Sequence, residues 1–239
     1  MRGFVYTAHA SRVIFGSGTL AQLPEEVERM GLKRALVLST PHQQGAAEET
    51  ARSIGTRSAG VFAGAAMHTP VEVTQRALEQ VKVIDADGIV AVGGGSTTGL
   101  AKAIALRTDL PQIVAPTTYA GSEMTPILGE TQEGVKTTQS SPRILPETVI
   151  YDIDLTLSLP VTLSITSGMN AIAHAVEALY ARERNPVISL LAEEGISAVS
   201  RALPGIKACS TSRPVSAPRW RFETSECLMP ASIERPTSR

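Results

Sequence analysis

Short, strongly apolar runs alternate along this chain with longer segments whose apolar residues recur every three to four positions. The apolar runs are typical of strands buried on both faces, and they are RALVLST (34–40), AGVFAG (59–64), DGIVAVGG (87–94) and PQIVAPTT (111–118). The segments between them are typical of helices, namely AAEETARSIG (46–55), TPVEVTQRALEQVKVI (69–84) and STTGLAKAIALRT (96–108). This alternation predicts an α/β fold in which helices cover both faces of a parallel sheet.

The stretches on either side of this region depart from the alternation. FVYTAH (4–9) and SRVIFGSG (11–18) predict a short antiparallel pair of strands. TLAQLPEEVERMG (19–31) predicts a helix that ends at its final glycine. EGVKTTQ (133–139) and RILPETVIYD (143–152) indicate an extended excursion that follows the last parallel strand.

From Leu159 the strand patterns cease, and LSITSGMNAIAHAVEALYARE (163–183) and NPVISLLAEEGISAVSRAL (185–203) predict amphipathic helices. We therefore expect an α/β domain over residues 1–155 and a partial helical domain over 156–207. Residues 208–239 are rich in Ser, Pro and Arg and hold both cysteines, so we expect an irregular or disordered tail. The abrupt change near Lys207 favours a shifted reading frame, with a natural short variant as the alternative.

Composition narrows the class of protein. With 43% hydrophobic and 19% charged residues in 239, the chain is typical of a globular protein. Its net charge of -1 gives no electrostatic argument for binding nucleic acid or an anionic membrane. We predict a cytoplasmic protein, because no apolar stretch approaches a membrane span and the N-terminus lacks a signal-peptide core. Cys209 and Cys227 are too few for a paired-cysteine zinc site and are expected to be unpaired thiols.

A run of three glycines joins a predicted strand to a predicted helix, as Gly93, Gly94 and Gly95 followed by Ser96. Glycines at such a junction let backbone amides approach an anion, and the start of a helix favours negative charge. The spacing matches neither G-x-G-x-x-G nor the nucleoside-triphosphate loop. The interpretation is a phosphate or pyrophosphate site, and a tight turn without ligand is the alternative.

A second polar cluster follows the next strand, with hydroxyls at Thr117, Thr118, Tyr119 and Ser122. Consecutive parallel strands usually lie close together, so the two loops should meet at the carboxyl edge of the sheet. Two polar loops at this edge favour a dinucleotide over a single phosphate. The alternative is that these hydroxyls only cap a turn.

A third cluster lies in GMNAIAHAVEALY (168–180), where Asn170 and His174 stand four residues apart on one face of the predicted helix. The same helix is expected to bury a stripe of apolar residues, which are Met169, Ile172, Val176 and Leu179. An i, i+4 pair can converge on one ligand. A hydrogen-bonded core histidine is the alternative.

With these clusters, residues from about Phe4 to Ile206 resemble the iron-containing alcohol dehydrogenase superfamily, most specifically in GGGSTTGLAKAIALRTDLPQIVAPTTYAGSEMTPILGET. The resemblance implies a Rossmann-like, dehydroquinate synthase-like domain that binds NADH or NADPH, followed by a helical substrate domain. It places the cofactor pyrophosphate at Gly93, Gly94, Gly95 and Ser96, a second cofactor loop at Thr117, Thr118 and Tyr119, and a further contact at Lys136. Ser39 and Thr40 follow an earlier strand and do not repel a 2′-phosphate, so both cofactors stay open.

Two departures from the family pattern bear on metal binding. Metal-dependent relatives carry GGGSxxDxAK, where this chain has Gly99, and a metal-binding aspartate in GMDAxxHAxE, where it has Asn170. A neutral amide is a poorer ligand for a divalent cation than a carboxylate. The family's later ligand histidines would follow residue 207, where this sequence has none. We therefore expect no bound metal.

Within the superfamily, the resemblance implies NAD(P)H-dependent reduction of maleylacetate, and of chloromaleylacetates with dechlorination, to 3-oxoadipate in aromatic degradation. His174 is then the candidate proton or hydrogen-bond donor, and Asn170 the residue that orients the substrate. The expected partners are a small dicarboxylate and, as one option, a second subunit in a homodimer, but neither nucleic acid nor membrane. The alternatives are a metal-dependent alcohol or glycerol dehydrogenase and a catalytically dead, nucleotide-binding fragment.

Overall fold

The structure is a computed structural model that describes residues 3–8 and 11–211, with side chains up to residue 205. It divides into two compact units, one of Thr7–Leu159 and one of Met1–Tyr6 with Pro160–Arg239. The sequence placed this division near residue 155, and the structure places it between Leu159 and Pro160. Most of the expected irregular tail, residues 212–239, lies outside the described residues.

The unit of Thr7–Leu159 is built on a six-stranded, wholly parallel sheet with strand order β1-β8-β5-β4-β2-β3. The strands are β1 Arg12–Gly16, β2 Ala35–Leu38, β3 Ser58–Phe62, β4 Gly88–Gly93, β5 Gln112–Pro116 and β8 Thr148–Asp152. From β2 the chain runs outward to β3, returns to the other side of β2 as β4, and continues through β5 to β8. The winding therefore changes direction between β2 and β4, where open α/β sheets bind ligands beyond the carboxyl ends of the strands.

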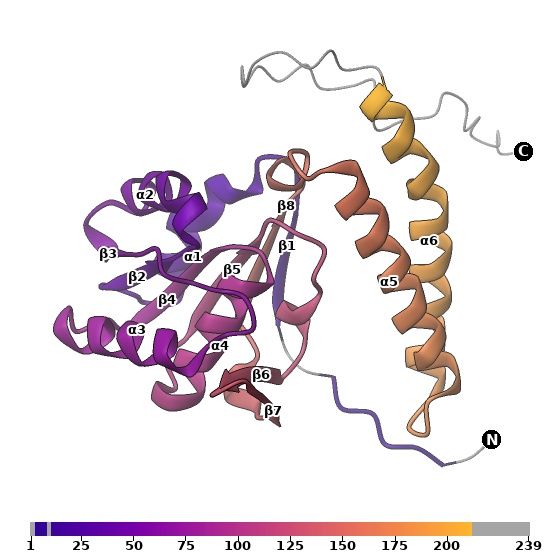
Figure 1. Ribbon diagram of the computed structural model, residues 1–239, viewed down its shortest axis with the longest axis horizontal. Helices are drawn as coiled ribbons and strands as arrows, with labels where there is room; N and C mark the ends of the chain where they lie inside the picture. The colour runs from indigo at the N-terminus through magenta and orange to yellow at the C-terminus, as the bar shows by residue number, and fades with distance from the viewer. Residues whose placement is uncertain (1–2, 9–10, 212–239) are drawn as a thin grey trace, which may run out of the picture. The chain divides into compact units, whose positions relative to one another are not determined.

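Helices cover both faces of this sheet, as predicted (Figure 1). The helices of the unit are α1 Leu23–Arg29, α2 Gln44–Ser53, α3 Val71–Val83 and α4 Gly95–Thr108. Alternate residues of the central strands enter two separate cores, because successive side chains of a strand point to opposite faces. Val37, Val90 and Ile113 pack with α1 and α2, whereas Leu36, Ile89 and Val114 pack with α3 and α4.

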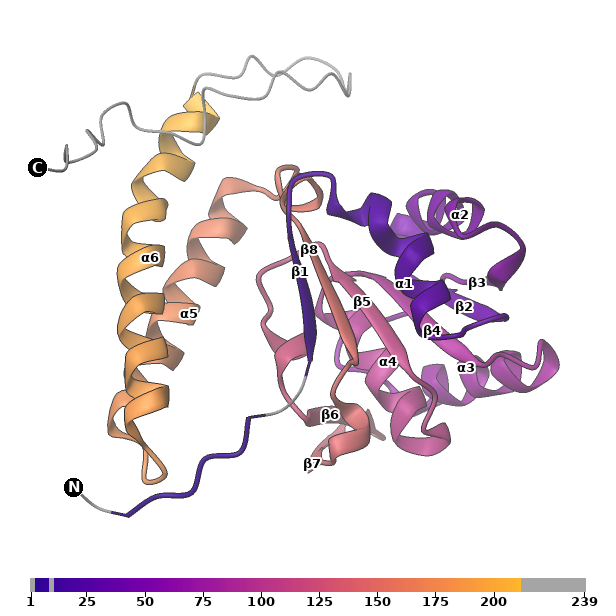
Figure 2. The ribbon, with the colours of Figure 1, turned by 180° about the vertical axis from the view of Figure 1, so that it is seen from behind.

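The expected antiparallel pair at the N-terminus is wrong. Residues 3–8 form no strand, and β1 instead pairs in parallel with β8, from Arg12 opposite Thr148 to Gly16 opposite Asp152 (Figure 2). The reason is long-range packing: β1 buries Ile14 in the core under α1, beside Ile150 of β8. The carboxylate of Asp152 then accepts from the amides of Gly18 and Leu20, at 3.0 and 2.9 Å, and fixes the turn after β1.

The excursion after β5 is a hairpin followed by the last strand of the sheet. β6 Ile127–Gln132 and β7 Val135–Ser140 pair antiparallel. Glu130 of β6 is 2% exposed and binds Arg107 of α4 at 3.0 Å, while Gln139 of β7 donates to it at 3.2 Å. The hairpin is thereby tied to the helix that follows the glycine run. RILPETVIYD ends in β8, which lies inside the sheet rather than in an excursion.

In the other unit, α5 Val161–Tyr180 and α6 Pro186–Thr211 pack against each other. α6 continues beyond the expected end of the helical domain at Lys207 to Thr211. A Cβ at Gly168 of α5 would lie 2.8 Å from Leu203 Cδ2, so the glycine allows a close approach of α6.

The predicted buried stripe of α5 is wrong in two of its four residues. Met169 is 53% exposed and Val176 is 42% exposed, whereas Ile172 and Leu179 are partly buried. The contact with α6 lies on the side of Gly168, and one neighbouring helix is too narrow to cover the whole apolar face. No described helix is both long and apolar enough to cross a membrane.

Candidate active site

Three loops meet at the carboxyl edge of β2, β4 and β5, which are neighbours in the sheet. The Thr117 amide, at the start of the loop after β5, donates to the carbonyl of Gly93, the last residue of β4, at 3.0 Å. The Gln43 side chain, from the loop after β2, donates to Thr117 Oγ1 at 3.2 Å. The glycine loop (residues 93–96) and the loop after β5 were expected to meet; this is confirmed, and the loop after β2 joins them.

The start of α4 offers backbone amides at this edge. α4 begins at Gly95, and no side chain of the described part of the chain caps it. The amides of Thr97 and Thr98 donate to the Gly94 carbonyl at 3.0 and 3.1 Å, whereas those of Gly95 and Ser96 stand too early in the helix to have an intrahelical acceptor. Gly95 is exposed and Ser96 partly buried. Uncapped amides at a helix start, beside a carboxyl edge of the sheet, suit the pyrophosphate of a dinucleotide.

The glycines of this region make room for threonines. A Cβ at Gly93 would collide with Thr97, and one at Gly94 would lie 2.9 Å from Thr118 Cγ2. Gly95 differs, because a Cβ there would meet only Ala120 Cβ, at 3.4 Å. Gly93 and Gly94 are thus required by packing within the protein, and Gly95 is the glycine of the run at which a Cβ could be accommodated.

The hydroxyl groups at this edge of the sheet differ in how deeply they are buried. Thr97 Oγ1 and Ser122 Oγ are buried without a hydrogen-bond partner among the described residues. Thr117 and Thr118 are partly buried, and Tyr119 is 46% exposed. The accessible hydroxyls of Thr117, Thr118 and Tyr119 can therefore donate to, or accept from, a ligand held against the glycine loop.

The loop after β2 presents different residues from those expected. Ser39 is fully buried and donates to the Thr40 carbonyl at 3.1 Å, so its hydroxyl is engaged within the protein. Thr40 donates to Gln43 Oε1 at 3.2 Å. Gln43 was missed by sequence reasoning, because a single glutamine in a loop carries no motif.

Behind the glycine loop lies a buried polar cluster that the sequence did not indicate. Lys102 of α4 is 1% exposed, and its Nζ donates to the Ser122 carbonyl at 2.5 Å and to Thr125 Oγ1 at 3.3 Å. Burial lowers the pKa of Lys102 to about 8, although the Glu123 carboxylate opposes that shift. Tyr151 of β8 donates to Glu123 at 2.9 Å, and burial, then the charge of Glu123, raises the pKa of this tyrosine.

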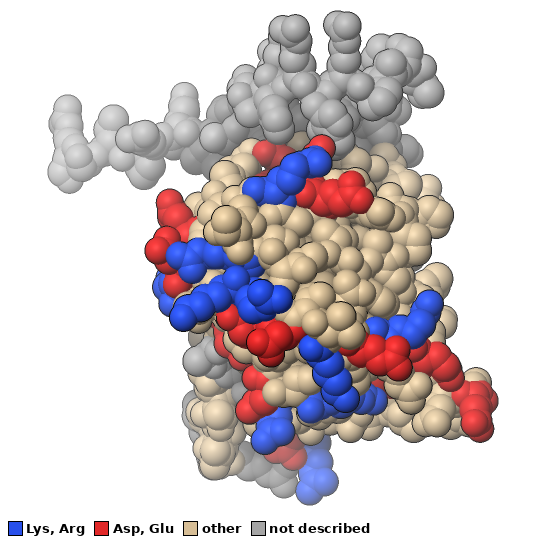
Figure 3. Space-filling model, turned by 90° about the vertical axis from the view of Figure 1, so that its left-hand side faces the viewer, with Lys and Arg blue, Asp and Glu red and all other residues tan. Residues whose placement is uncertain are grey.

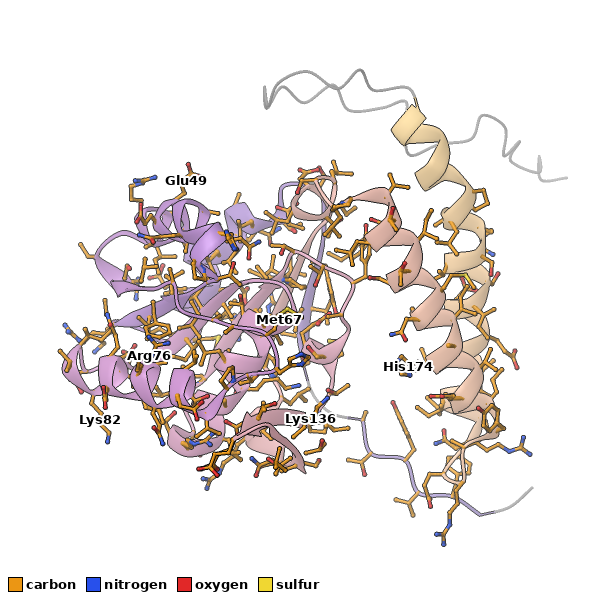
Figure 4. All side chains as sticks on the ribbon, in the orientation of Figure 1. Glu49, Met67, Arg76, Lys82, Lys136 and His174 are labelled. Atoms are coloured by element: carbon orange, nitrogen blue, oxygen red, sulfur yellow. The ribbon has the colours of Figure 1, made fainter. Side chains whose placement is uncertain are left out.

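Lys136 lies on β7, where it is exposed and its side chain passes over Gly129 of β6 (Figure 4). No hydrogen bond joins it to the described residues of the three loops. Its role in binding a cofactor stays a prediction.

Asn170 and His174 lie on α5, in the other unit, and both are exposed. His174 Nδ1 lies 3.3 Å from Glu177 Oε2, one turn further along the helix (Figure 4). Within the described residues, no three His, Cys, Asp or Glu side chains come together as a metal site would require. The donors around His174 therefore do not assemble an iron site from this part of the chain alone.

The surface seen in Figure 3 carries acidic and basic side chains side by side, without a large area of one sign. This agrees with the net charge of -1. A basic stripe, the usual electrostatic footprint of a nucleic-acid-binding face, is not seen in this view.

Comparison with known proteins places the chain in a family. The profile of the iron-containing alcohol dehydrogenase family matches residues 10–153. The maleylacetate reductase of Rhizobium sp. strain MTP-10005 is 63% identical over 207 residues, covering 87% of this chain and 59% of that protein. The maleylacetate reductase of Sphingobium indicum is 54% identical over 208 residues, with the same two coverages.

A solved structure gives the same result. The crystal structure of maleylacetate reductase from Agrobacterium tumefaciens is 59% identical, with a TM-score of 0.87, and covers 89% of this chain and 61% of that one. The chain thus spans about three-fifths of the length of the relatives it matches. The matched profile, the shared fold and the glycine loop together show that the chain belongs to the iron-containing alcohol dehydrogenase family.

Proposed function

We propose that the protein is an NAD(P)H-dependent reductase that converts maleylacetate to 3-oxoadipate. The observation that carries the proposal is the uncapped start of α4, which lies at the change in winding and is flanked by the loops after β2 and β5. Such a site holds a dinucleotide rather than a lone phosphate. The substrate follows from the relatives, which are maleylacetate reductases at 63% and 54% identity.

The residues of each unit take separate parts in this proposal. The amides of Gly95 and Ser96 hold the pyrophosphate, and Thr117 and Thr118 donate hydrogen bonds from the second loop. Tyr119 and Lys136 are further candidate contacts. Thr40 and Gln43 carry no negative charge, so the loop after β2 accepts either NADH or NADPH.

The reaction demands little beyond orientation and hydrogen bonding. A bound dihydronicotinamide supplies the hydride. When hydride reaches C2 of the substrate, whose C2=C3 bond is conjugated with the C4 ketone, the negative charge comes to rest on the ketone oxygen. His174 is the candidate to donate a hydrogen bond to that oxygen or a proton to C3, and Asn170 to orient the dicarboxylate. With chlorine at C2, the enolate can re-form the ketone and the C2=C3 bond as chloride leaves, which gives maleylacetate for a second reduction and extends the proposal to chlorinated substrates.

The test of the cofactor site is a fluorescence titration with NADH on the Gly95→Ala variant. Alanine fits the fold at this position, because its Cβ would meet only Ala120, whereas it crowds the approach to the helix amides. We expect Kd to rise at least tenfold, about 1.4 kcal/mol. Gly94 is unsuitable for this purpose, since any side chain there would press on Thr118.

Gly45→Ala is the matched control. Gly45 of α2 is exposed, with nothing within 4 Å of its Cβ position, and this variant should bind NADH like the parent. Unchanged affinity in folded Gly95→Ala protein would remove the pyrophosphate from the start of α4.

The two alternatives are separated by turnover and by metal content. A nucleotide-binding fragment without activity would bind NADH but would not oxidise it when maleylacetate is added. A metal-dependent alcohol dehydrogenase would carry stoichiometric metal and would oxidise simple alcohols. A homodimer is part of the proposal, and sedimentation of the purified chain tests it.

A further inference from the structure

Lys102 is buried in a way that the stability of the fold does not require. It lies in α4 with 1% of its surface exposed, although lysine is almost never fully buried unless it is paired. Its Nζ reaches no carboxylate among the described side chains and instead donates to the Ser122 carbonyl and to Thr125 Oγ1. Burial of a charge in this manner is unfavourable, and apolar residues of similar volume are often as stabilising or more so. Methionine would fill this space at lower cost to the fold.

Glu123, the neighbour of Ser122, is a second buried charge at this place. It is 2% exposed, and Tyr151 OH donates to its Oε1 at 2.9 Å. Its Oε2 is buried without a hydrogen-bond partner among the described residues. Lys102 therefore holds this short turn by its hydrogen bond to the Ser122 carbonyl. Glu123 holds the same turn by accepting a hydrogen bond from Tyr151 of β8.

The turn that they hold belongs to the loop of residues 117–125, which we call the hydroxyl loop. Its near end lies on the glycine loop, where the Thr117 amide donates to Gly93 and the Thr118 side chain covers Gly94. Its far end is the turn over Ser122, Glu123 and Met124, which follows Gly121 at φ +73. Between these two ends, Tyr119 and Ala120 are exposed. The loop is thus fixed at both ends, to Gly93 and Gly94 just before α4 and to Lys102 within this helix.

We propose that Lys102 and Glu123 are positioning residues that hold the hydroxyl loop against the start of α4, and so set the shape of the cofactor site. Neither side chain contacts the cofactor. The inference rests on the proposed function for the identity of the ligand, whereas the anchoring of the loop stands on the hydrogen bonds alone.

Three variants of the 239-residue chain test this. Lys102→Met keeps the length of the side chain and removes its hydrogen bonds, and Glu123→Gln keeps the shape and the acceptor for Tyr151 while removing the charge. Lys82→Met is the control, because Lys82 is exposed on the outer face of α3 (Figure 4). Two measurements are made on each, namely hydrogen–deuterium exchange of the amides of residues 117–125 and the Kd for NADH between pH 7 and pH 9.5.

The pH series separates positioning from a general loss of packing. In the parent chain, burial lowers the pKa of Lys102 to about 8, so the charged fraction of this lysine, and with it the affinity for NADH, should fall as pH rises through this range. The charged groups of the elements packed on α4 are Glu123 of the turn, Glu130 of β6 with Arg107, Arg143 with Asp109, and the exposed α3 side chains Glu72, Arg76, Glu79 and Lys82. β4 and β5 contribute no charged residue. Carboxylates, guanidinium groups and exposed lysines do not ordinarily titrate between pH 7 and 9.5.

We expect faster exchange across 117–125 in Lys102→Met, with a Kd at pH 7 at least tenfold above the parent value and no further rise toward pH 9.5. Glu123→Gln should speed exchange in the same amides, and it keeps the inference testable if Lys102→Met does not fold. Lys82→Met should retain the parent exchange, Kd and pH dependence.

Parent-like exchange in folded Lys102→Met would overturn the inference, whatever the NADH result. Faster exchange with an unchanged Kd would also overturn it, because the loop would then not shape the site. If the parent chain binds no NADH while Lys102→Met still loosens the loop, the anchoring is supported and the proposed function is the part that fails.

Discussion

Gly99, in the first half of α4, is the position at which the packing of the site can be tested most sharply. A Cβ there would lie far inside the 3.0 Å that real Cβ atoms keep from other atoms, against Oγ1 of Thr69 in the loop before α3. Thr69 cannot move aside at low cost. It is 6% exposed, its φ is +47, and its carbonyl accepts from the Thr131 amide at 3.2 Å, while a β-branched side chain has few alternative rotamers.

The magnitude for Gly99→Ala follows from two opposing effects. Replacing a mid-helix glycine with alanine normally stabilises a helix by about 1 kcal/mol. Overpacking a rigid core costs about 1–3 kcal/mol, and a contact this short belongs in the upper part of that range. The free energy of unfolding should therefore fall by about 1–2 kcal/mol.

The sign should reverse when Thr69 is shortened. In Thr69→Ala the nearest remaining atom is Cβ of residue 69, at 3.6 Å, so Gly99→Ala should then stabilise by about 1 kcal/mol. Urea unfolding of the four chains of this double-mutant cycle measures the coupling, with Gly45→Ala as the control helical glycine in open space. If Gly99→Ala stabilises the parent chain as much as Gly45→Ala does, the steric argument is refuted.

Four further results are expected. Arg107→Met leaves Glu130 buried without a countercharge, so the free energy of unfolding should fall by about 3–5 kcal/mol. Arg52→Met removes an ion pair with Glu49 that is exposed, and should change this free energy by less than about 0.5 kcal/mol; similar losses in both would contradict this. Between pH 8 and 9.5 the parent chain should gain stability relative to Lys102→Met. The pKa of this lysine is about 8 in the folded protein and 10.5 for a free lysine side chain, so the unfolded chain binds more protons in this range. An equal difference in unfolding free energy between the two chains at both pH values, measured by denaturant titration, would contradict this. Protein purified without added metal should contain far less than one equivalent of iron or zinc, since the amide of Asn170 is a poor ligand, and activity lost to chelation and restored by iron would argue the reverse. The chain should aggregate at high protein concentration, because apolar side chains such as Met169 and Leu190 are exposed on α5 and α6; light scattering per mass that does not rise with concentration would contradict this.

The parallel strands were predictable because burial on both faces leaves a continuous apolar run. β2, β4 and β5 are buried along their whole lengths, and each coincides with a predicted run. β8 has the short sequence TVIYD between Glu147 and Ile153, and no local feature reveals that it lies between β5 and β1. Its place is decided by packing with residues that are distant in sequence, as is the parallel pairing of β1.

The backbone of the site could be predicted, whereas its internal packing could not. A strand, a glycine run and a helix suffice to place amides at the edge of the sheet. The packing of the Thr118 side chain over Gly94 depends on the distance between two loops, and the hydrophobic pattern of the sequence does not predict that distance. Lys102 would be assigned to a solvated helix face on its residue type alone, and it is buried because the sheet, α3 and the hydroxyl loop enclose α4.

The pairing of β1 with β8 also sets the order in which this protein can be completed during synthesis. Arg12 of β1 lies opposite Thr148 of β8. The ribosome must therefore add 136 residues after Arg12 before Thr148 exists, which takes roughly 7–27 s at about 5–20 residues per second. Throughout that interval Val13 and Phe15 have no strand beside them, and from the completion of β5 at Pro116 this strand presents an unpaired edge on the side that β8 will occupy. A nascent chain halted before residue 148 should therefore recruit chaperones that bind exposed strands, and one halted well beyond Asp152 should release them.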